Sequence, residues 1–296
     1  MTMTAPQRTT IAPAVALLQA GAGLLAVYAY LIGQHFDLAV IRAVLNRPLG
    51  LGEDFGPLAL LVLLATTGYT ATFDRSPLVS RLRRTYLPAG IAVGLAAVLV
   101  TFGVPIWTSP DAADASLLTF AGNLSLVSQL VTDAPLLVPL AWVVLLQLVG
   151  VATAELTRRF GVVVPIAQII VVTVVVAVAP TSRAALVLVF YPLVVVGQVI
   201  ALHSRRVIPT WIASGTAMLC AIPVLGLNNT NEEFAQWWYP VASLIAALLV
   251  AVAVVVSGET ARRLAGHVAV RWLADHAIWL VVLAGVIGYP LLGGAP

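Results

Sequence analysis

Two clusters of polar side chains in this sequence could carry chemistry, and the first combines a histidine with three acids. His35 and Asp37 lie two residues apart, and Glu53 and Asp54 follow in the same stretch. A histidine can take a proton from a hydroxyl group near neutral pH, and a nearby carboxylate can fix its tautomer. Paired acids can instead bind a divalent metal for sugar transfer from a lipid carrier. The structural alternative is that Asp37 caps a helix and the others are solvated loop residues.

The second cluster is basic. Arg81, Arg83 and Arg84 lie within four residues and are followed by Tyr86 and Pro88. Arginine binds phosphate oxygens through paired, charge-assisted hydrogen bonds. These side chains could therefore hold the phosphates of a carrier such as coenzyme A, or of a lipid headgroup. The alternative is that they only mark a cytoplasmic loop, because such loops attract arginine in any membrane protein.

The elements that position both clusters are too apolar for a water-soluble fold. The chain has 296 residues, of which 61% are hydrophobic and 9% charged, against about 25% charged in a typical soluble domain. Lipid must surround much of this surface. We expect a single integral membrane domain over residues 1–296, with no second soluble domain.

Nine segments are long and apolar enough to cross a bilayer, which takes about 20 residues for a core of about 30 Å. They cover residues 12–31, 56–73, 86–106, 134–153, 161–179, 184–202, 208–226, 237–256 and 272–292. The sequence therefore predicts an all-α fold, a polytopic transmembrane helix bundle of about nine (nine to ten) spans.

The arginines indicate the orientation of this bundle. All fifteen basic residues are arginine. With alternating spans and a cytoplasmic N-terminus, the outer loops hold only Arg42, Arg47 and Arg183. The inner side holds Arg8, Arg75, Arg81, Arg83, Arg84, Arg158, Arg159, Arg205, Arg206, Arg262, Arg263 and Arg271. This excess on one side follows the positive-inside rule and predicts a multi-pass protein of the cell (plasma) membrane with its N-terminus inside.

The same pattern disfavours several functions. Because topology explains the arginines, the pI of about 9.4 gives no reason to expect a nucleic-acid partner. Cys220 is the only cysteine and no HExxH motif occurs, which disfavours a zinc protease and any metal site built on thiols. The spans hold almost no ionisable side chain away from their ends, which disfavours an ion-coupled transporter. We therefore expect any reaction centre near an interface.

Two segments look amphipathic rather than spanning. Residues 36–49 predict a helix along the outer interface, and residues 260–271 predict an inner interfacial helix that touches anionic headgroups. For the second segment, a solvated basic face is the alternative. Amides at depth, such as Gln147, favour hydrogen bonds between helices over ligand binding.

Several motifs in order along the chain resemble the acyltransferase-3 family of membrane enzymes. They are Asp54-Phe55-Gly56-Pro57, the second span with Thr67-Gly68-Tyr69, the basic stretch from Arg81 to Pro88, Asn123-Leu124, Trp142 to Gln147, Phe190-Tyr191-Pro192 and Arg271 to Ala277. In this order the motifs cover nearly the whole chain.

The resemblance implies transfer of an acyl group from a cytoplasmic acyl-CoA-like donor to a hydroxyl of an envelope glycan, lipid or small molecule. His35 would be the catalytic base. Arg81, Arg83, Arg84, Gln147 and Trp142 would bind substrate. No tightly bound cofactor and no metal are implied; the partners would be membrane lipids and the envelope acceptor.

Two other functions stay open. No arginine lies in the first span ahead of His35, and Gln147 stands where the family's fourth helix carries glutamate. These differences favour a catalytically inactive scaffold or accessory subunit with a membrane-protein partner. A lipid-carrier-dependent glycosyltransferase that uses Glu53 and Asp54 is the third hypothesis.

Overall fold

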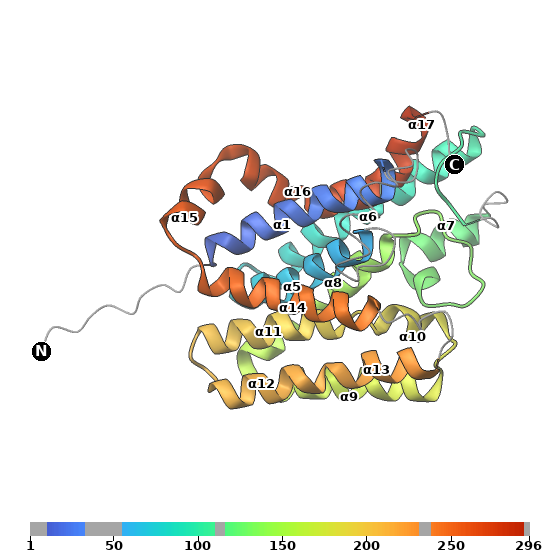
Figure 1. Cartoon of the computed structure of the whole chain (residues 1–296). Coiled ribbons are helices and arrows are strands. Elements are labelled where there is room, and N and C mark those ends of the chain that lie inside the picture. The colour runs from blue at the N-terminus through green and yellow to red at the C-terminus, as the bar shows by residue number, and fades with distance from the viewer. Residues whose placement is uncertain (1–10, 33–54, 110–115, 231–237, 293–296) are drawn as a thin grey trace, which may run out of the picture.

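A computed structural model describes residues 11–32, 55–109, 116–230 and 238–292, and the helices in these ranges form one bundle (Figure 1). The first half contains α1 (Pro13–Val27), a π-helical turn η1 (Tyr28–Ile32), α5 (Gly56–Phe73), α6 (Leu78–Thr101), α7 (Leu117–Leu124), a short 3-10 turn (Val127–Gln129) and α8 (Ala141–Phe160). The second half contains α9 (Val163–Val178), α10 (Arg183–Leu188), α11 (Pro192–Ser204), α12 (Thr210–Leu219), α13 (Ala221–Thr230), α14 (Trp238–Val255), α15 (Glu259–Gly266), α16 (Val268–Leu283), a second π-helical turn η5 (Ala284–Gly288) and α17 (Tyr289–Leu291). No strand occurs in the described ranges, so the predicted all-α fold is confirmed there.

Seven helical segments are long and apolar enough to cross a bilayer. They are Pro13–Leu31, Gly56–Phe73, Leu78–Thr101, Ala141–Phe160, Arg183–Ser204, Thr210–Thr230 and Val268–Leu291. Two further apolar helices do not qualify as single straight spans. The helix α9 has 16 residues, and α14 continues into α15 only through a bend of 103°. The chain is thus a membrane protein built on a helical bundle.

The helix α5 forms the centre of the bundle. It packs against α1, α8, α11 and α14, while α9, α12 and α13 form a layer on the far side of α11 (Figure 1). Its sequence fits a central position because apolar residues cover all faces of the helix, and neighbouring helices surround it. The hydroxyls of Thr66 and Thr67 both donate to the carbonyl of Leu63, so these polar groups are satisfied within the helix.

Glycines bring α5 and α11 into backbone contact. A Cβ atom on Gly68 would lie 1.9 Å from the carbonyl oxygen of Val194, and one on Gly197 would lie 2.0 Å from that of Ala65. Lipid tails are as apolar as the helix surfaces, so the gain from pairing two helices comes largely from such close contact. This contact fixes the central pair of helices.

The structure corrects the ends of two predicted spans. The predicted span 86–106 is α6, which begins at Leu78 directly after Pro77, so Arg81, Arg83 and Arg84 lie in its first turns rather than in a loop. The predicted span 134–153 is α8, which begins at Ala141 and ends at Phe160. Hydropathy missed the start of α6 and the end of α8 because the residues there include arginines that are nevertheless helical. It placed the start of α8 too early because the apolar residues before Ala141 are interrupted by prolines and form turns.

The predicted interfacial helix at 260–271 is also shorter than expected. Helix α15 ends at Gly266, and the extended backbone of His267 (ψ 136°) separates it from α16. Residues 268–271 therefore begin the last long helix. The predicted outer helix at 36–49 lies outside the described residues.

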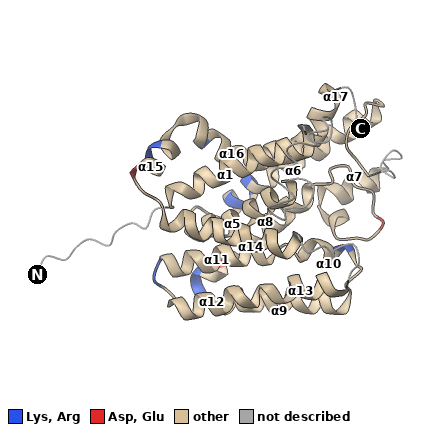
Figure 2. Cartoon of the chain, viewed as in Figure 1, with Lys and Arg blue, Asp and Glu red and all other residues tan. Residues whose placement is uncertain are grey.

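Basic residues gather at one end of the bundle. Figure 2 shows basic positions at α15 and around the turn between α11 and α12, at the end where α1 begins, others further in between the labels α1 and α5, and one at α10 at the opposite end. The latter is Arg183, the first residue of α10. Its guanidinium donates to the carbonyls of Ser128 and Ala134, which holds the turns before α8 against α10.

Candidate functional site: an arginine-lined pocket

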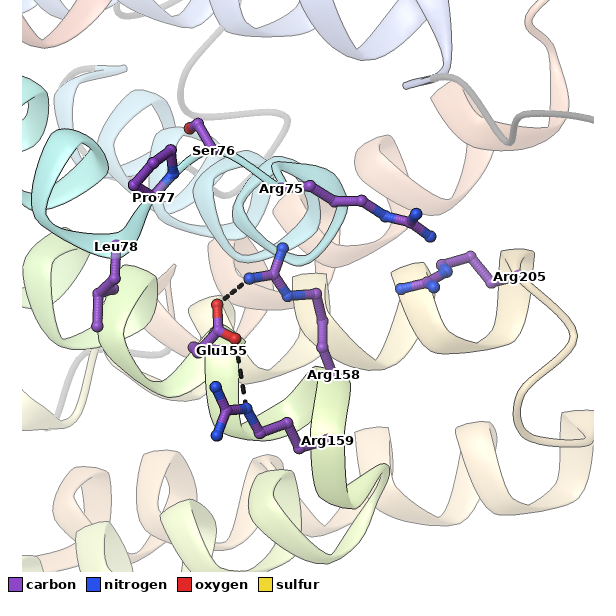
Figure 3. Close-up of a pocket in the computed structure, with 8 residues that line it drawn as sticks. All are labelled: Arg75, Ser76, Pro77, Leu78, Glu155, Arg158, Arg159 and Arg205. Carbon is purple, nitrogen blue, oxygen red and sulfur yellow. Dashed lines mark hydrogen bonds and ion pairs between the residues drawn. The ribbon is translucent and has the colours of Figure 1, made fainter.

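A pocket of about 550 Å³ opens at the basic end of the bundle (Figure 3). It lies between the α5–α6 turn, the last turns of α8 and the end of α11. The lining residues are Arg75, Ser76, Pro77, Leu78, Glu155, Arg158, Arg159 and Arg205. Four arginines and one glutamate make this lining strongly positive.

The chain reverses tightly at the rim of this pocket. Helix α5 ends at Phe73, and Asp74 leaves it in an extended conformation. Both the backbone N–H and the hydroxyl of Ser76 donate to one oxygen of the Asp74 carboxylate, at 2.9 and 2.6 Å. Pro77 then caps the start of α6. This short turn places Arg75 opposite the end of α8.

Helix ends explain part of the arginine density. The last turns of α5, α8 and α11 meet here, and the carbonyl ends of helices carry partial negative charge that arginine stabilises. Arg158 donates to the carbonyl of Asp74 and pairs with Glu155. The positive charge left after these contacts faces the pocket.

Glu155 organises the arginines around it. Its carboxylate pairs with Arg158 and, at 3.4 Å, with Arg159 from the same helix, and it lies 3.7 Å from Arg81 of α6. Figure 3 shows Arg158 and Arg159 on either side of Glu155, with Arg75 and Arg205 extending toward each other beyond them. One carboxylate cannot neutralise all of these side chains, so the pocket is suited to an anion with several oxygens, such as a phosphate.

Asp74 is held as a carboxylate. Burial raises its pKa, but the hydrogen bonds from Ser76 and the charge of Arg84, at 2.7 Å, lower the pKa by more, so that it lies below the ordinary 3.8. The resulting negative charge lies next to the pocket turn and fixes Arg84, whose guanidinium also contacts the Ser76 hydroxyl.

Arg81 is part of the protein interior rather than of the pocket lining. Only 2% of its side chain is exposed. It donates to the carbonyls of Asp74, at 2.8 Å, and Val151, at 2.6 Å. Its Nε atom is buried without a hydrogen-bond partner. Arg83, by contrast, is exposed on the surface of α6.

The other predicted binding residues lie inside the bundle. Gln147 of α8 donates to the hydroxyl of Thr67 of α5 at 2.9 Å, and both are buried. The ring of Trp142 packs on Phe190 with centroids 4.8 Å apart. The structure therefore brings Arg81 and Arg84 together around Asp74, whereas Gln147 and Trp142 belong to helix contacts.

A buried polar network continues inward from the end of α8. Gln198 of α11 accepts from Thr157 at 3.0 Å and donates to Thr153 at 3.1 Å. The hydroxyl of Tyr191 contacts Thr153 at 2.9 Å and donates to Gln168 of α9 at 2.7 Å. These hydrogen bonds connect three helices, as expected of amides and hydroxyls within a membrane bundle.

The outer cluster cannot be placed in this geometry. His35, Asp37, Glu53 and Asp54 lie outside the described residues. In the described ranges, no group of three or more His, Cys, Asp or Glu side chains could hold a metal ion. The eight residues that line the pocket include no histidine and no cysteine. The titratable side chains of the pocket lining are therefore its four arginines and Glu155.

Arg75, Arg158, Arg159 and Arg205 were not predicted as site residues. In the sequence they lie in three short loops, with Arg158 and Arg159 in the same one, and topology alone explains each of them. A signal was present, because all four belong to the same predicted side of the membrane. Their convergence depends on how α5, α8 and α11 end, which the sequence does not show directly.

The class of protein that fold and site define is a helical membrane protein with a cationic pocket at one end. Comparison of the chain with family models, with curated proteins and with solved structures finds no match.

Proposed function

We propose that the chain crosses the cell membrane nine times with its N-terminus in the cytoplasm. The seven long helices, α9 and α14 supply nine crossings. Neighbouring crossings run in opposite directions in Figure 1, so the C-terminal ends of α5, α8 and α11 fall on one side together. Arg158 lies in the last turn of α8, and Arg75 and Arg205 follow the ends of α5 and α11. The excess of arginine at that end supports a cytoplasmic location.

We further propose that the protein is a membrane acyltransferase whose arginine pocket binds the phosphates of an acyl-CoA-like donor. The observation that carries this proposal is the convergence of Arg75, Arg158, Arg159 and Arg205 on one cavity with a single acid in its lining. A coenzyme A donor presents several phosphates, which match a multi-arginine site. Arg83 and Arg84 lie on the adjoining helix α6 outside the pocket lining, and Arg84 is paired with Asp74.

In this proposal the acceptor is a hydroxyl group of an envelope glycan, lipid or small molecule. His35 takes the hydroxyl proton, the acceptor oxygen attacks the thioester carbonyl, and the coenzyme A thiolate leaves and is then protonated. Binding of donor and acceptor in one protein would supply much of the rate. No metal and no tightly bound cofactor enter this reaction.

The test follows a labelled acyl group from acyl-CoA into the envelope fraction of membranes that contain the protein. Arg159→Gln/Arg205→Gln is expected to raise the donor concentration needed for half-maximal rate, and His35→Ala to abolish transfer. Arg206→Gln is the matched control, because Arg206 is an exposed arginine next to Arg205 that does not line the pocket. Transfer that is unchanged in His35→Ala contradicts the role of this residue as base.

A second candidate function is a non-catalytic accessory subunit. The observation that favours it is that Arg81 and Gln147 are bound to protein groups rather than directed into the pocket. In that case the fold persists as a scaffold for a membrane-protein partner. Stoichiometric co-purification with such a partner, together with no turnover of acyl-CoA by either the parent or the His35→Ala protein, would favour this function.

A further inference from the structure

The helix α15 stands apart from the rest of the bundle. It meets α14 at 103°, so it runs across the bundle end rather than along the spans. None of its residues is buried, although it contacts α1. A hydrogen bond of 3.3 Å from the backbone N–H of Ala14 to the hydroxyl of Ser257 ties the start of α1 to the turn just before α15. The helix is therefore held in place at the end of two long helices.

Exposed basic and apolar side chains lie close together in this segment and in the first turns of α16. Arg262 and Arg263 are 69% and 79% exposed, and the single carboxylate of Glu259 pairs with both, at 3.0 and 3.3 Å. Leu264, Val268 and Trp272 are each at least half exposed. In water these apolar side chains, one on α15 and two on the first turns of α16, would be uncovered beside the basic residues.

We propose that α15 lies in the plane of the cytoplasmic leaflet and binds the headgroups of anionic phospholipids. The proposal rests on the proposed topology, which puts this end of the bundle in the cytoplasm. The segment joins two helices that enter the bilayer, so the leaflet surface is next to it on both sides. Leu264 and Trp272 then enter the boundary of the acyl chains, while Arg262 and Arg263 meet the phosphates. Arg271, exposed in the first turn of α16, adds a third positive charge.

The positive charge of α15 and the exposed apolar side chains next to it together favour lipid over a protein partner. A protein partner would need both an acidic and an apolar surface, whereas an anionic leaflet provides both at the depth where α14 and α16 emerge. The expected consequence is a preference for phosphatidylglycerol over phosphatidylcholine that falls with salt, since exposed charges are screened.

The test places an environment-sensitive fluorophore on Leu264→Cys in a Cys220→Ala background, with the purified full chain in vesicles. Brominated phosphatidylglycerol is expected to quench it more strongly than brominated phosphatidylcholine. Each arginine removed in Arg262→Gln/Arg263→Gln should lower this preference roughly fivefold at low salt. The Arg206→Gln control should keep it, and matching thermal unfolding curves show that each variant is folded.

Equal quenching by the two lipids, or a preference that survives the double variant, overturns the proposal. So does a fluorophore that stays in water in both vesicles and is shielded only when cytoplasmic protein is added, which would indicate a protein partner. The pocket arginines are unchanged in these variants. Coenzyme A binding in the same samples therefore tests the proposed function separately.

Discussion

Arg81 donates a hydrogen bond of 2.6 Å to the backbone carbonyl of Val151, seventy residues further along the chain. This contact joins the first turns of α6 to the middle of α8. The same guanidinium also donates to the carbonyl of Asp74, at the end of α5. One buried arginine therefore connects three helices directly behind the pocket.

Replacement of Arg81 by glutamine should destabilise the bundle. The change removes the hydrogen bonds that the guanidinium donates to the carbonyls of Asp74 and Val151, and a buried acceptor left unsatisfied costs about 1–3 kcal/mol. The thermal unfolding midpoint of the purified protein should drop clearly. Arg83→Gln is the matched control, since Arg83 is exposed on the same helix, and its midpoint should stay close to that of the parent. Equal midpoints for the two variants would contradict a structural role for Arg81.

Gly68→Ala should separate α5 from α11. The new Cβ would lie 1.9 Å from the carbonyl oxygen of Val194, and backbone atoms cannot yield as a flexible side chain can. We expect low yield of folded protein or a markedly lower unfolding midpoint. Gly94→Ala in α6 has open space around the new Cβ, so it should be neutral or stabilising by up to about 1 kcal/mol. A stable Gly68→Ala protein would show that these helices are not in backbone contact.

The stability of the pocket turn should depend on acid pH through Asp74. Because the pKa of Asp74 is lower in the folded protein than its ordinary 3.8, its charged form stabilises the fold above 3.8. That contribution is lost as the pH falls through the lower, folded-state pKa. The midpoint of thermal unfolding should fall less steeply with decreasing pH in Asp74→Asn than in the parent. Identical slopes would mean that the carboxylate does not hold the turn.

The proposed topology can be checked with single cysteines in a Cys220→Ala background. Ser125 and Val207 are both exposed, at opposite ends of the bundle. In intact cells, a membrane-impermeant maleimide should label Ser125→Cys and should label Val207→Cys only after the membrane is permeabilised. The reverse pattern would place the arginine pocket outside the cell.

The sequence predicted the helices well where polar residues or prolines bound the apolar run. Predicted residues 56–73 coincide with α5, because Gly56-Pro57 begins this helix and Asp74 follows it. The prediction failed where a helix begins or ends at a different residue from the apolar run. Arg81, Arg83 and Arg84 are helical because α6 extends beyond the apolar run, and hydropathy does not register helix in charged residues.

The candidate site was harder to predict, because it is a product of tertiary packing. Arg158 reaches the carbonyl of Asp74 across 84 residues of sequence. The spacing of the arginines along the chain does not predict that contact. The burial of Arg81 likewise depends on acceptors from α8, so a dense basic motif alone does not separate a structural arginine from one that faces a ligand.

The most direct test of the central claim is equilibrium binding of coenzyme A to the purified protein. If the arginine pocket holds the donor phosphates, the parent binds coenzyme A in a salt-dependent way. Arg159→Gln/Arg205→Gln should weaken binding by roughly tenfold or more, since hydrogen bonds to charged groups contribute about 1.5–3 kcal/mol each. Arg206→Gln should bind like the parent. No binding by the parent, or equal affinity in the double variant and the control, would contradict the proposed donor site.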